Sequence, residues 1–213
     1  MKKKNTKKGP PVGGFKFLMF LIRPLFKLLY SPKIIDAKNI PEQGAVVIAG
    51  NHKHAFDQFM TISATKRPIN YMAKREYFDG KLEPLFRFAG CIPVNRNGTD
   101  FEAIKAGLCV LKRGGAIGIF PEGTRNRTSE FLLEFKAGAV ALAKKTGAPI
   151  VPFGLSGDYK FRSKNLTIRF GKPFYVSDMT VEEATERLFN EVKCLMEENI
   201  KEEKTASSEK NMA

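Results

Sequence analysis

Two short polar clusters hold the residues best suited to chemistry, and the first contains both histidines of the chain. This cluster, "NHKHAFD" at 51–57, places His52 and His54 shortly before Asp57. A carboxylate that holds one imidazole nitrogen leaves the other free to accept a proton, which is how a general base is built. Helical spacing favours a His54–Asp57 pair, whereas His52 reaches Asp57 only from a turn that precedes a helix. Taken alone, the cluster also fits a surface histidine and a helix-capping aspartate.

The second cluster, "PEGTRNR" at 121–127, is suited to binding an anion. Arg125 and Arg127 can each donate paired hydrogen bonds to phosphate oxygens, and Gly123 allows a close approach of backbone N–H groups. Glu122 either orients the arginines or binds an acceptor hydroxyl, and a solvated charged turn is the alternative for the whole cluster.

Two more cations follow apolar runs, namely Lys74 after 69–73 and Arg96 within "AGCIPVNRNG". Each is also compatible with a plain surface charge. The chain has no GxSxG elbow, no P-loop and no HExxH pair, so the sequence does not support a serine nucleophile, a nucleotide cradle or a catalytic zinc. We therefore expect neither a metal nor a cofactor.

Short β-like runs alternate with segments of helical periodicity from residue 44 onward. The predicted strands are 45–50, 69–74, 115–120, 149–155 and 166–170, and the predicted helices are 100–113, 131–145 and one that begins at 180. Capping boxes at Thr99–Glu102 and Thr180–Glu183 mark two helix starts. This order predicts a single α/β domain with a mixed, mainly parallel sheet flanked by helices.

The two polar clusters directly follow the predicted strands 45–50 and 115–120. Ligands of such sheets bind beyond the carboxyl ends of the strands. We therefore expect both clusters to converge on one ligand at the same edge of the sheet.

The net charge of +14 is concentrated at the N-terminus, where ten of the cations and a single acidic residue lie in residues 1–38. Residues 15–30 are apolar but interrupted by charges and Pro24, which argues against a membrane span and against a cleaved signal. On a helical wheel the cations Lys16, Arg23 and Lys27 face away from a set of apolar residues, Leu18, Ile22, Leu25 and Leu29. This pattern predicts an amphipathic helix at an anionic membrane surface, either kinked or split at Pro24; a core helix with solvated cations is the alternative.

The expected organisation has four parts: a basic disordered arm at 1–14, an interfacial helical segment at 15–33, the main domain at 34–200 and a disordered polar tail at 201–213.

Four motifs in order give the chain its resemblance to a family: "NHKHAFD", "GCIPVNR", "FPEGTRNR" and "APIVPFGL". Over roughly residues 30–175 it resembles the glycerolphosphate acyltransferase family, which includes bacterial 1-acylglycerol-3-phosphate acyltransferases. The resemblance implies that His52 is the general base and that Asp57 orients it, against the helical spacing that favours His54. It further implies acceptor binding by Arg96, Glu122, Gly123, Arg125 and Lys74, with Thr124 supporting the loop, and an acyl site shaped by Pro149 and Pro152.

The implied reaction moves an acyl chain from an acyl thioester, of coenzyme A or of acyl carrier protein, to the free hydroxyl of lysophosphatidic acid. The implied location of the protein is the cytoplasmic face of the cell membrane. The implied reaction requires neither a metal nor a cofactor. Three alternatives remain: an acyltransferase with another lysolipid or glycerol 3-phosphate as acceptor, a nucleic-acid-binding protein, or a catalytically inactive membrane-surface protein.

Overall fold

The computed structural model describes residues 12–95, 98 and 100–211, without the side chains of 12–16, 18 and 209–211. Its helices are α1 (Val12–Tyr30), α2 (Asp57–Ala64), α3 (Glu83–Phe88), α4 (Phe101–Lys112), α5 (Gly138–Thr146) and α6 (Val181–Asn211), with 3₁₀ turns at Ala37–Asn39 and Arg75–Phe78. Its strands are β1 (Lys33–Ile35), β2 (Val46–Gly50), β3 (Ile69–Lys74), β4 (Ile92–Val94), β5 (Ala116–Ile119), β6 (Ile150–Ser156) and β7 (Thr167–Phe170).

The described strands form one seven-stranded sheet in the order β1-β7-β6-β2-β5-β3-β4. All neighbouring pairs are parallel except β6 and β7, which run antiparallel. The predicted α/β class with a mixed, mainly parallel sheet is therefore confirmed, as are the five predicted strands. The two strands that the sequence analysis missed, β1 and β4, are three residues long and lie at the edges of the sheet.

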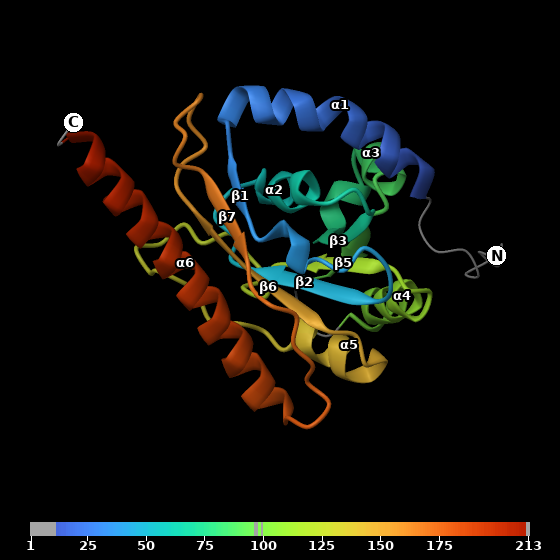
Figure 1. Cartoon of the computed structure of the whole chain (residues 1–213). Coiled ribbons are helices and arrows are strands. Elements are labelled where there is room, and N and C mark those ends of the chain that lie inside the picture. The colour runs from blue at the N-terminus through green and yellow to red at the C-terminus, as the bar shows by residue number, and fades with distance from the viewer. Residues whose placement is uncertain (1–11, 96–97, 99, 212–213) are drawn as a thin grey trace, which may run out of the picture.

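Helices cover both faces of the sheet, with α1, α2 and α3 on one side and α4 and α5 on the other (Figure 1). The alternation of buried residues along β2 explains this, because successive strand side chains point to opposite faces. Val47 and Ala49 pack in the core beneath α4, α5 and α6, whereas Val46 and Ile48 pack in the core beneath α1 and α2. The central strand is thus buried on both faces, which is typical of a parallel sheet.

Three of the predicted helices require corrections of their boundaries. Asp100, not Thr99, caps α4 by accepting a hydrogen bond from the N–H of Ala103 at 3.0 Å; Thr99 itself lies outside the described residues. Helix α5 begins at Gly138 instead of residue 131. The Thr180–Glu183 capping box is present in both directions, but α6 continues to Asn211, so the expected disordered tail is wrong for residues 201–211.

Helix α1 is a single helix with Pro24 inside it, and its orientation corrects the helical-wheel interpretation. Arg23 is only partly exposed, because its guanidinium group turns toward α2 and donates hydrogen bonds to the carbonyl oxygens of Ile62 and Thr65 at the end of that helix. Lys16 and Leu18 fall outside the described side chains. None of the helices within the described ranges is both long and apolar enough to cross a bilayer.

Helix α6 lies directly on β6 at Gly154, and this contact generates a stability prediction. A Cβ atom at Gly154 would lie 2.7 Å from the backbone nitrogen of Met196 and 2.8 Å from Cβ of Leu195. Gly154→Ala should therefore lower the free energy of unfolding by about 1–3 kcal/mol, because backbone atoms of α6 must move. Urea unfolding measures this change.

Gly138→Ala is the control for this prediction. A Cβ atom at Gly138 would meet nothing within 4 Å beyond its own helix backbone and its chain neighbours, so the variant should unfold no earlier than the unsubstituted protein. Equal stability of the Gly154 and Gly138 variants would contradict the prediction.

Candidate functional site

The two polar clusters meet at one edge of the sheet because β2 and β5 are parallel neighbours. The "NHKHAFD" segment leaves the end of β2, and the "PEGTRNR" segment leaves the end of β5. A backbone hydrogen bond joins them directly, since the N–H of Asn126 donates to the carbonyl oxygen of His52 at 2.7 Å. The prediction that the two clusters lie at the same edge of the sheet is therefore confirmed.

The imidazole that contacts Asp57 belongs to His52. Its Nδ1 lies 2.8 Å from Oδ2 of Asp57. Helix α2 begins only at Asp57, so both histidines lie in the turn that precedes it. His54 reaches Asp57 through its backbone only: its N–H donates to Oδ2 of Asp57 at 2.8 Å, and its carbonyl oxygen accepts from the N–H of Asp57 at 3.2 Å. The spacing argument for a His54–Asp57 side-chain pair is therefore wrong, because that argument assumed a helix that has not yet started.

Asp57 is completely buried, and four hydrogen bonds compensate for its charge. Oδ2 accepts hydrogen bonds from His52 and from the N–H groups of Lys53 and His54, and Oδ1 accepts one from the hydroxyl of Tyr159 at 2.6 Å. A buried carboxylate without such donors would be costly. The arrangement leaves Nε2 of His52 as the ring atom that can exchange a proton with a ligand.

Both carboxylate oxygens of Glu122 bind backbone groups of the site. One of its carboxylate oxygens accepts a hydrogen bond from the backbone N–H of His52, and the other accepts one from the N–H of Leu133 at 3.1 Å. Burial raises the pKa of Glu122, and these two hydrogen bonds oppose that effect. The sequence-based expectation that Glu122 contacts an acceptor is therefore not supported: it lines neither of the cavities described next.

His52 lies where two cavities meet, and its ring stacks on Phe120 with 4.0 Å between ring centres. The first cavity, of about 470 Å³, lies between the sheet and the helices α4 and α5. Gly123 and Lys136 border it beside His52, and most of the remaining wall is apolar.

The second cavity, of about 670 Å³, lies on the side of the sheet that α1, α2 and α3 cover. Three cations line it, namely Lys74, Arg125 and Arg127, together with Thr124. Lys74 also forms an ion pair with Glu76 at 2.8 Å. The cavity continues into an apolar wall formed by residues such as Ile62, Ile69 and Phe86. A ligand with an anionic head and a long apolar part would match this lining.

The remaining predicted site residues take other positions. Arg96 lies outside the described residues. Pro149 and Pro152 border neither cavity at His52. Cys91 lines the larger cavity, but burial raises the pKa of its thiol to about 11, so it is not a thiolate near neutral pH. Within the described part of the chain, no group of three or more His, Cys, Asp or Glu residues could hold a metal ion.

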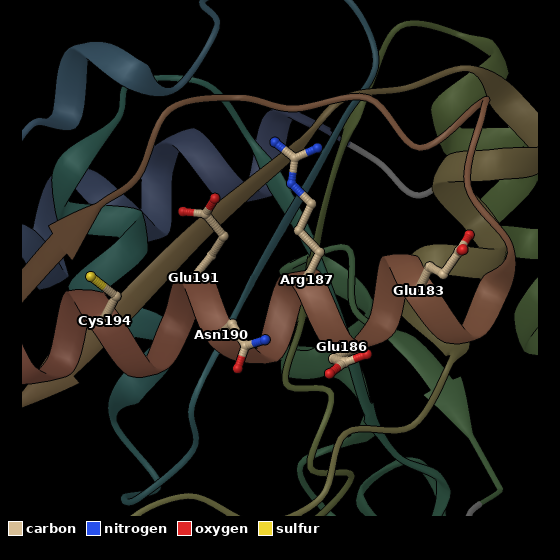
Figure 2. A pocket seen from close by; sticks show the side chains of 6 residues that line it. All are labelled: Glu183, Glu186, Arg187, Asn190, Glu191 and Cys194. Atoms are coloured by element: carbon tan, nitrogen blue, oxygen red, sulfur yellow. The ribbon is translucent and has the colours of Figure 1, made fainter.

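A third cavity, of about 530 Å³, lies along α6 and contains none of the predicted site residues. Figure 2 shows its lining, with three glutamates, Arg187, Asn190 and Cys194 projecting from the helix. Arg187 lies over the ring of Phe174 at 4.3 Å, and burial with nearby glutamates raises the pKa of Cys194. Neither group is therefore poised for chemistry there.

Tyr159 is the functional candidate that the sequence analysis missed. It follows β6, and it is 102 positions from Asp57 in the chain. The one signal that could have identified it is its place after a strand that neighbours β2 in the sheet, which requires the strand order to be known.

Comparison with known proteins places these features in a family. The Acyltransferase family model matches residues 31–156. A 1-acyl-sn-glycerol-3-phosphate acyltransferase of Bacillus subtilis is 31% identical over 82% of this chain and 89% of its own length. A protein of the same name from Borreliella burgdorferi is 34% identical over 67% of this chain and 58% of its own length.

The fold also matches a solved structure. The crystal structure of the 1-acyl-sn-glycerophosphate acyltransferase of Thermotoga maritima superposes with a TM-score of 0.68, at 22% identity, over 86% of this chain and 76% of that one. These matches favour an acyltransferase over the nucleic-acid-binding alternative. With the family model covering more than half of its residues, the chain belongs to the Acyltransferase family, and the two bacterial relatives named above are 1-acyl-sn-glycerol-3-phosphate acyltransferases.

Proposed function

We propose that this protein transfers an acyl chain from an acyl thioester to the free sn-2 hydroxyl of 1-acyl-sn-glycerol 3-phosphate, producing phosphatidic acid for phospholipid synthesis. The observation that carries the proposal is the His52–Asp57 pair at the junction of two cavities, one of which is lined by cations. The names of the bacterial relatives support the choice of acceptor.

In the proposed reaction, Asp57 holds Nδ1–H of His52, so Nε2 takes the proton from the acceptor hydroxyl. The hydroxyl oxygen attacks the thioester carbonyl carbon, and a tetrahedral intermediate forms. The C–S bond then breaks, and the sulfur takes the proton that His52 had accepted and leaves as a thiol. Because a thiolate is a good leaving group, the transfer needs no covalent enzyme intermediate, metal or cofactor.

The larger cavity is the proposed acceptor site. Lys74, Arg125 and Arg127 line it together with His52, and they can bind the phosphate of the acceptor. The apolar part of the same cavity suits the acyl chain that the acceptor already carries. Arg96 remains a further proposed phosphate ligand on the strength of the family resemblance.

The smaller cavity, which also reaches His52, then remains for the thioester donor of coenzyme A or acyl carrier protein. Its mainly apolar wall suits an acyl chain, and Gly123 and Lys136 border it beside His52. Glu122 contributes by holding the backbone of His52 in place between both sites.

Helix α1 is proposed to dock the protein on the anionic, cytoplasmic leaflet of the membrane. One face of the helix packs against the domain through Met19 and Phe26. The outward face exposes a row of large apolar side chains: Phe17, Phe20, Leu21, Leu25 and Leu28. Met19 and Ile22 of the same helix line the larger cavity, so an acceptor lipid in the leaflet lies next to its proposed site.

The two histidines provide the first functional test. His52→Ala should reduce kcat for acylation of lysophosphatidic acid by about 10²–10⁴-fold, the range expected for loss of a general base. His54→Ala should keep kcat within about tenfold, because only the backbone of His54 contacts Asp57. Activity is measured with purified, folded proteins and with both thioester donors. Equal losses in the two variants would contradict the assignment of His52.

Arg125→Ala tests the proposed acceptor site. Its loss should raise the KM for lysophosphatidic acid by about 10–100-fold while the KM for the donor stays nearly constant, because a charge-assisted hydrogen bond to phosphate is lost. Lys145→Ala is the matched control, since it removes an exposed cation of α5 that lines neither cavity. An unchanged acceptor KM in Arg125→Ala would rule out this role, and a panel of lysolipids and glycerol 3-phosphate identifies the preferred acceptor.

Phe20→Glu tests the membrane-docking face, because Phe20 is 77% exposed on α1. Placing a charge there should lower the affinity for phosphatidylglycerol vesicles at least tenfold, since burial of a Phe side chain contributes about 1.5–3 kcal/mol. Co-sedimentation with the vesicles measures this affinity. Phe101→Glu is the control: Phe101 is 76% exposed, but it lies at the start of α4. Docking through α1 is refuted if Phe20→Glu binds as the unsubstituted protein does, or if both variants lose the same affinity.

A further inference from the structure

The second carboxylate oxygen of Asp57 has a partner that the proposed reaction does not use. Oδ2 is shared by His52 and two backbone N–H groups, whereas Oδ1 accepts the hydrogen bond of Tyr159 at 2.6 Å. We propose that Tyr159 is a positioning residue for acyl transfer, whose hydroxyl fixes Oδ1 so that Oδ2 stays against His52. This inference rests on the function proposed above for the His52–Asp57 pair.

Tyr159 acts through Asp57 and not on a substrate. It is absent from the residues that line the two cavities at His52. Burial, followed by the charge of Asp57, raises the pKa of its hydroxyl far above neutral pH. The hydroxyl therefore stays protonated, and it remains a hydrogen-bond donor throughout the working pH range.

An aromatic cluster holds the ring of Tyr159 in place; we define it as Phe26, Tyr30, His54, Phe56 and Tyr159. The ring of His54 stacks on Tyr159 at 4.4 Å, and Tyr30 meets it edge-on at 5.5 Å. Phe26 and Phe56 lie 6.4 and 6.3 Å away. The side chain of His54 thereby gains a role: it packs on the positioning residue while His52 performs the chemistry.

The aromatic cluster also connects Asp57 to helix α1, because Phe26 and Tyr30 belong to that helix. The loop that carries Tyr159 is fastened to the same helix, since the N–H of Arg162 donates to the carbonyl oxygen of Leu29 at 2.8 Å. Helix α1 therefore contributes to the placement of the catalytic pair in addition to its proposed contact with lipid.

The charges around His52 determine what removal of the hydroxyl would do. Asp57 contacts its ring, and Glu122 accepts a hydrogen bond from its backbone. Of the two cavities that it borders, the larger is lined by the cations Lys74, Arg125 and Arg127, and the smaller is lined by Lys136 and Asp100. His54 and Tyr159 lie behind Asp57. Without the hydroxyl, Oδ1 is no longer fixed, and the carboxylate keeps its charge with one donor fewer, so it attracts the proton on His52 more strongly and raises the pKa of the imidazole.

Tyr159→Phe is the direct test in the whole 213-residue chain, because it removes only the hydroxyl and keeps the ring. We expect kcat to fall about tenfold, the effect of losing one hydrogen bond to a charged group, while both KM values change by less than about twofold. The acidic limb of the kcat/KM profile should move to higher pH. Tyr30→Phe is the matched control, since it alters another tyrosine of the aromatic cluster that does not donate to Asp57. The proposal fails if Tyr159→Phe leaves kcat and the acidic limb unchanged, or if Tyr30→Phe changes them equally.

A titration of the His52 ring by NMR, without substrate, separates this proposal from the proposed function. The pKa of His52 should rise in Tyr159→Phe and stay constant in Tyr30→Phe. If the unsubstituted protein does not acylate lysophosphatidic acid but this rise occurs, the proposed function is wrong and the coupling of Tyr159 to His52 stands. If the protein is active and neither kcat nor the pKa responds to Tyr159→Phe, the positioning role alone is overturned.

The link to α1 is tested by a double-mutant cycle. Tyr30→Ala removes a ring that packs on Tyr159, so it should lower kcat in the unsubstituted background and have a smaller effect in the Tyr159→Phe background. The same fold-change in both backgrounds would show that α1 does not act through the hydroxyl of Tyr159.

Discussion

The burial of one carboxylate, that of Asp57, determines how the rest of the site is arranged. A fully buried charge is tolerated only where donors surround it, and here they come from a side chain and two backbone groups of the 52–54 turn and from the distant Tyr159. Three of these donors curl the turn around Oδ2 before α2 begins. The position of His52 is therefore a consequence of satisfying Asp57.

The sheet order makes the turn after β2 a shared element of two cavities. Because β2 and β5 are adjacent, Phe120 at the end of β5 stacks on His52, and Glu122 two residues later holds its backbone. The helices on the two faces of the sheet then enclose separate spaces that both reach the imidazole. A reaction between two lipophilic substrates needs this kind of junction, in which each one has a space of its own and both meet at one base.

Local patterns predicted the elements whose contacts are themselves local. The five longer strands follow from their continuous apolar runs, and the start of α6 follows from its capping box. The start of α5 was misjudged because residues 131–137 have helical periodicity while their backbone is used elsewhere: Leu133 N–H binds Glu122, and Lys136 N–H binds the carbonyl oxygen of Pro121. Similarly, Arg23 turns inward because its carbonyl partners lie at the C-terminal end of α2, about forty residues away.

The choice between the two histidines shows the same limit at the level of the site. Helical spacing selects His54, the motif of the family selects His52, and only the three-dimensional structure explains the difference, since α2 starts too late for His54 to share a face with Asp57. Tyr159 was beyond both kinds of sequence argument, because no motif includes it and its partner is 102 positions away. A buried acid that recruits a donor from another loop makes the site depend on the fold as a whole, and the aromatic cluster extends that dependence to α1. The helix that exposes a row of large apolar side chains to the surroundings is thus also packed against Tyr159, which donates a hydrogen bond to Asp57.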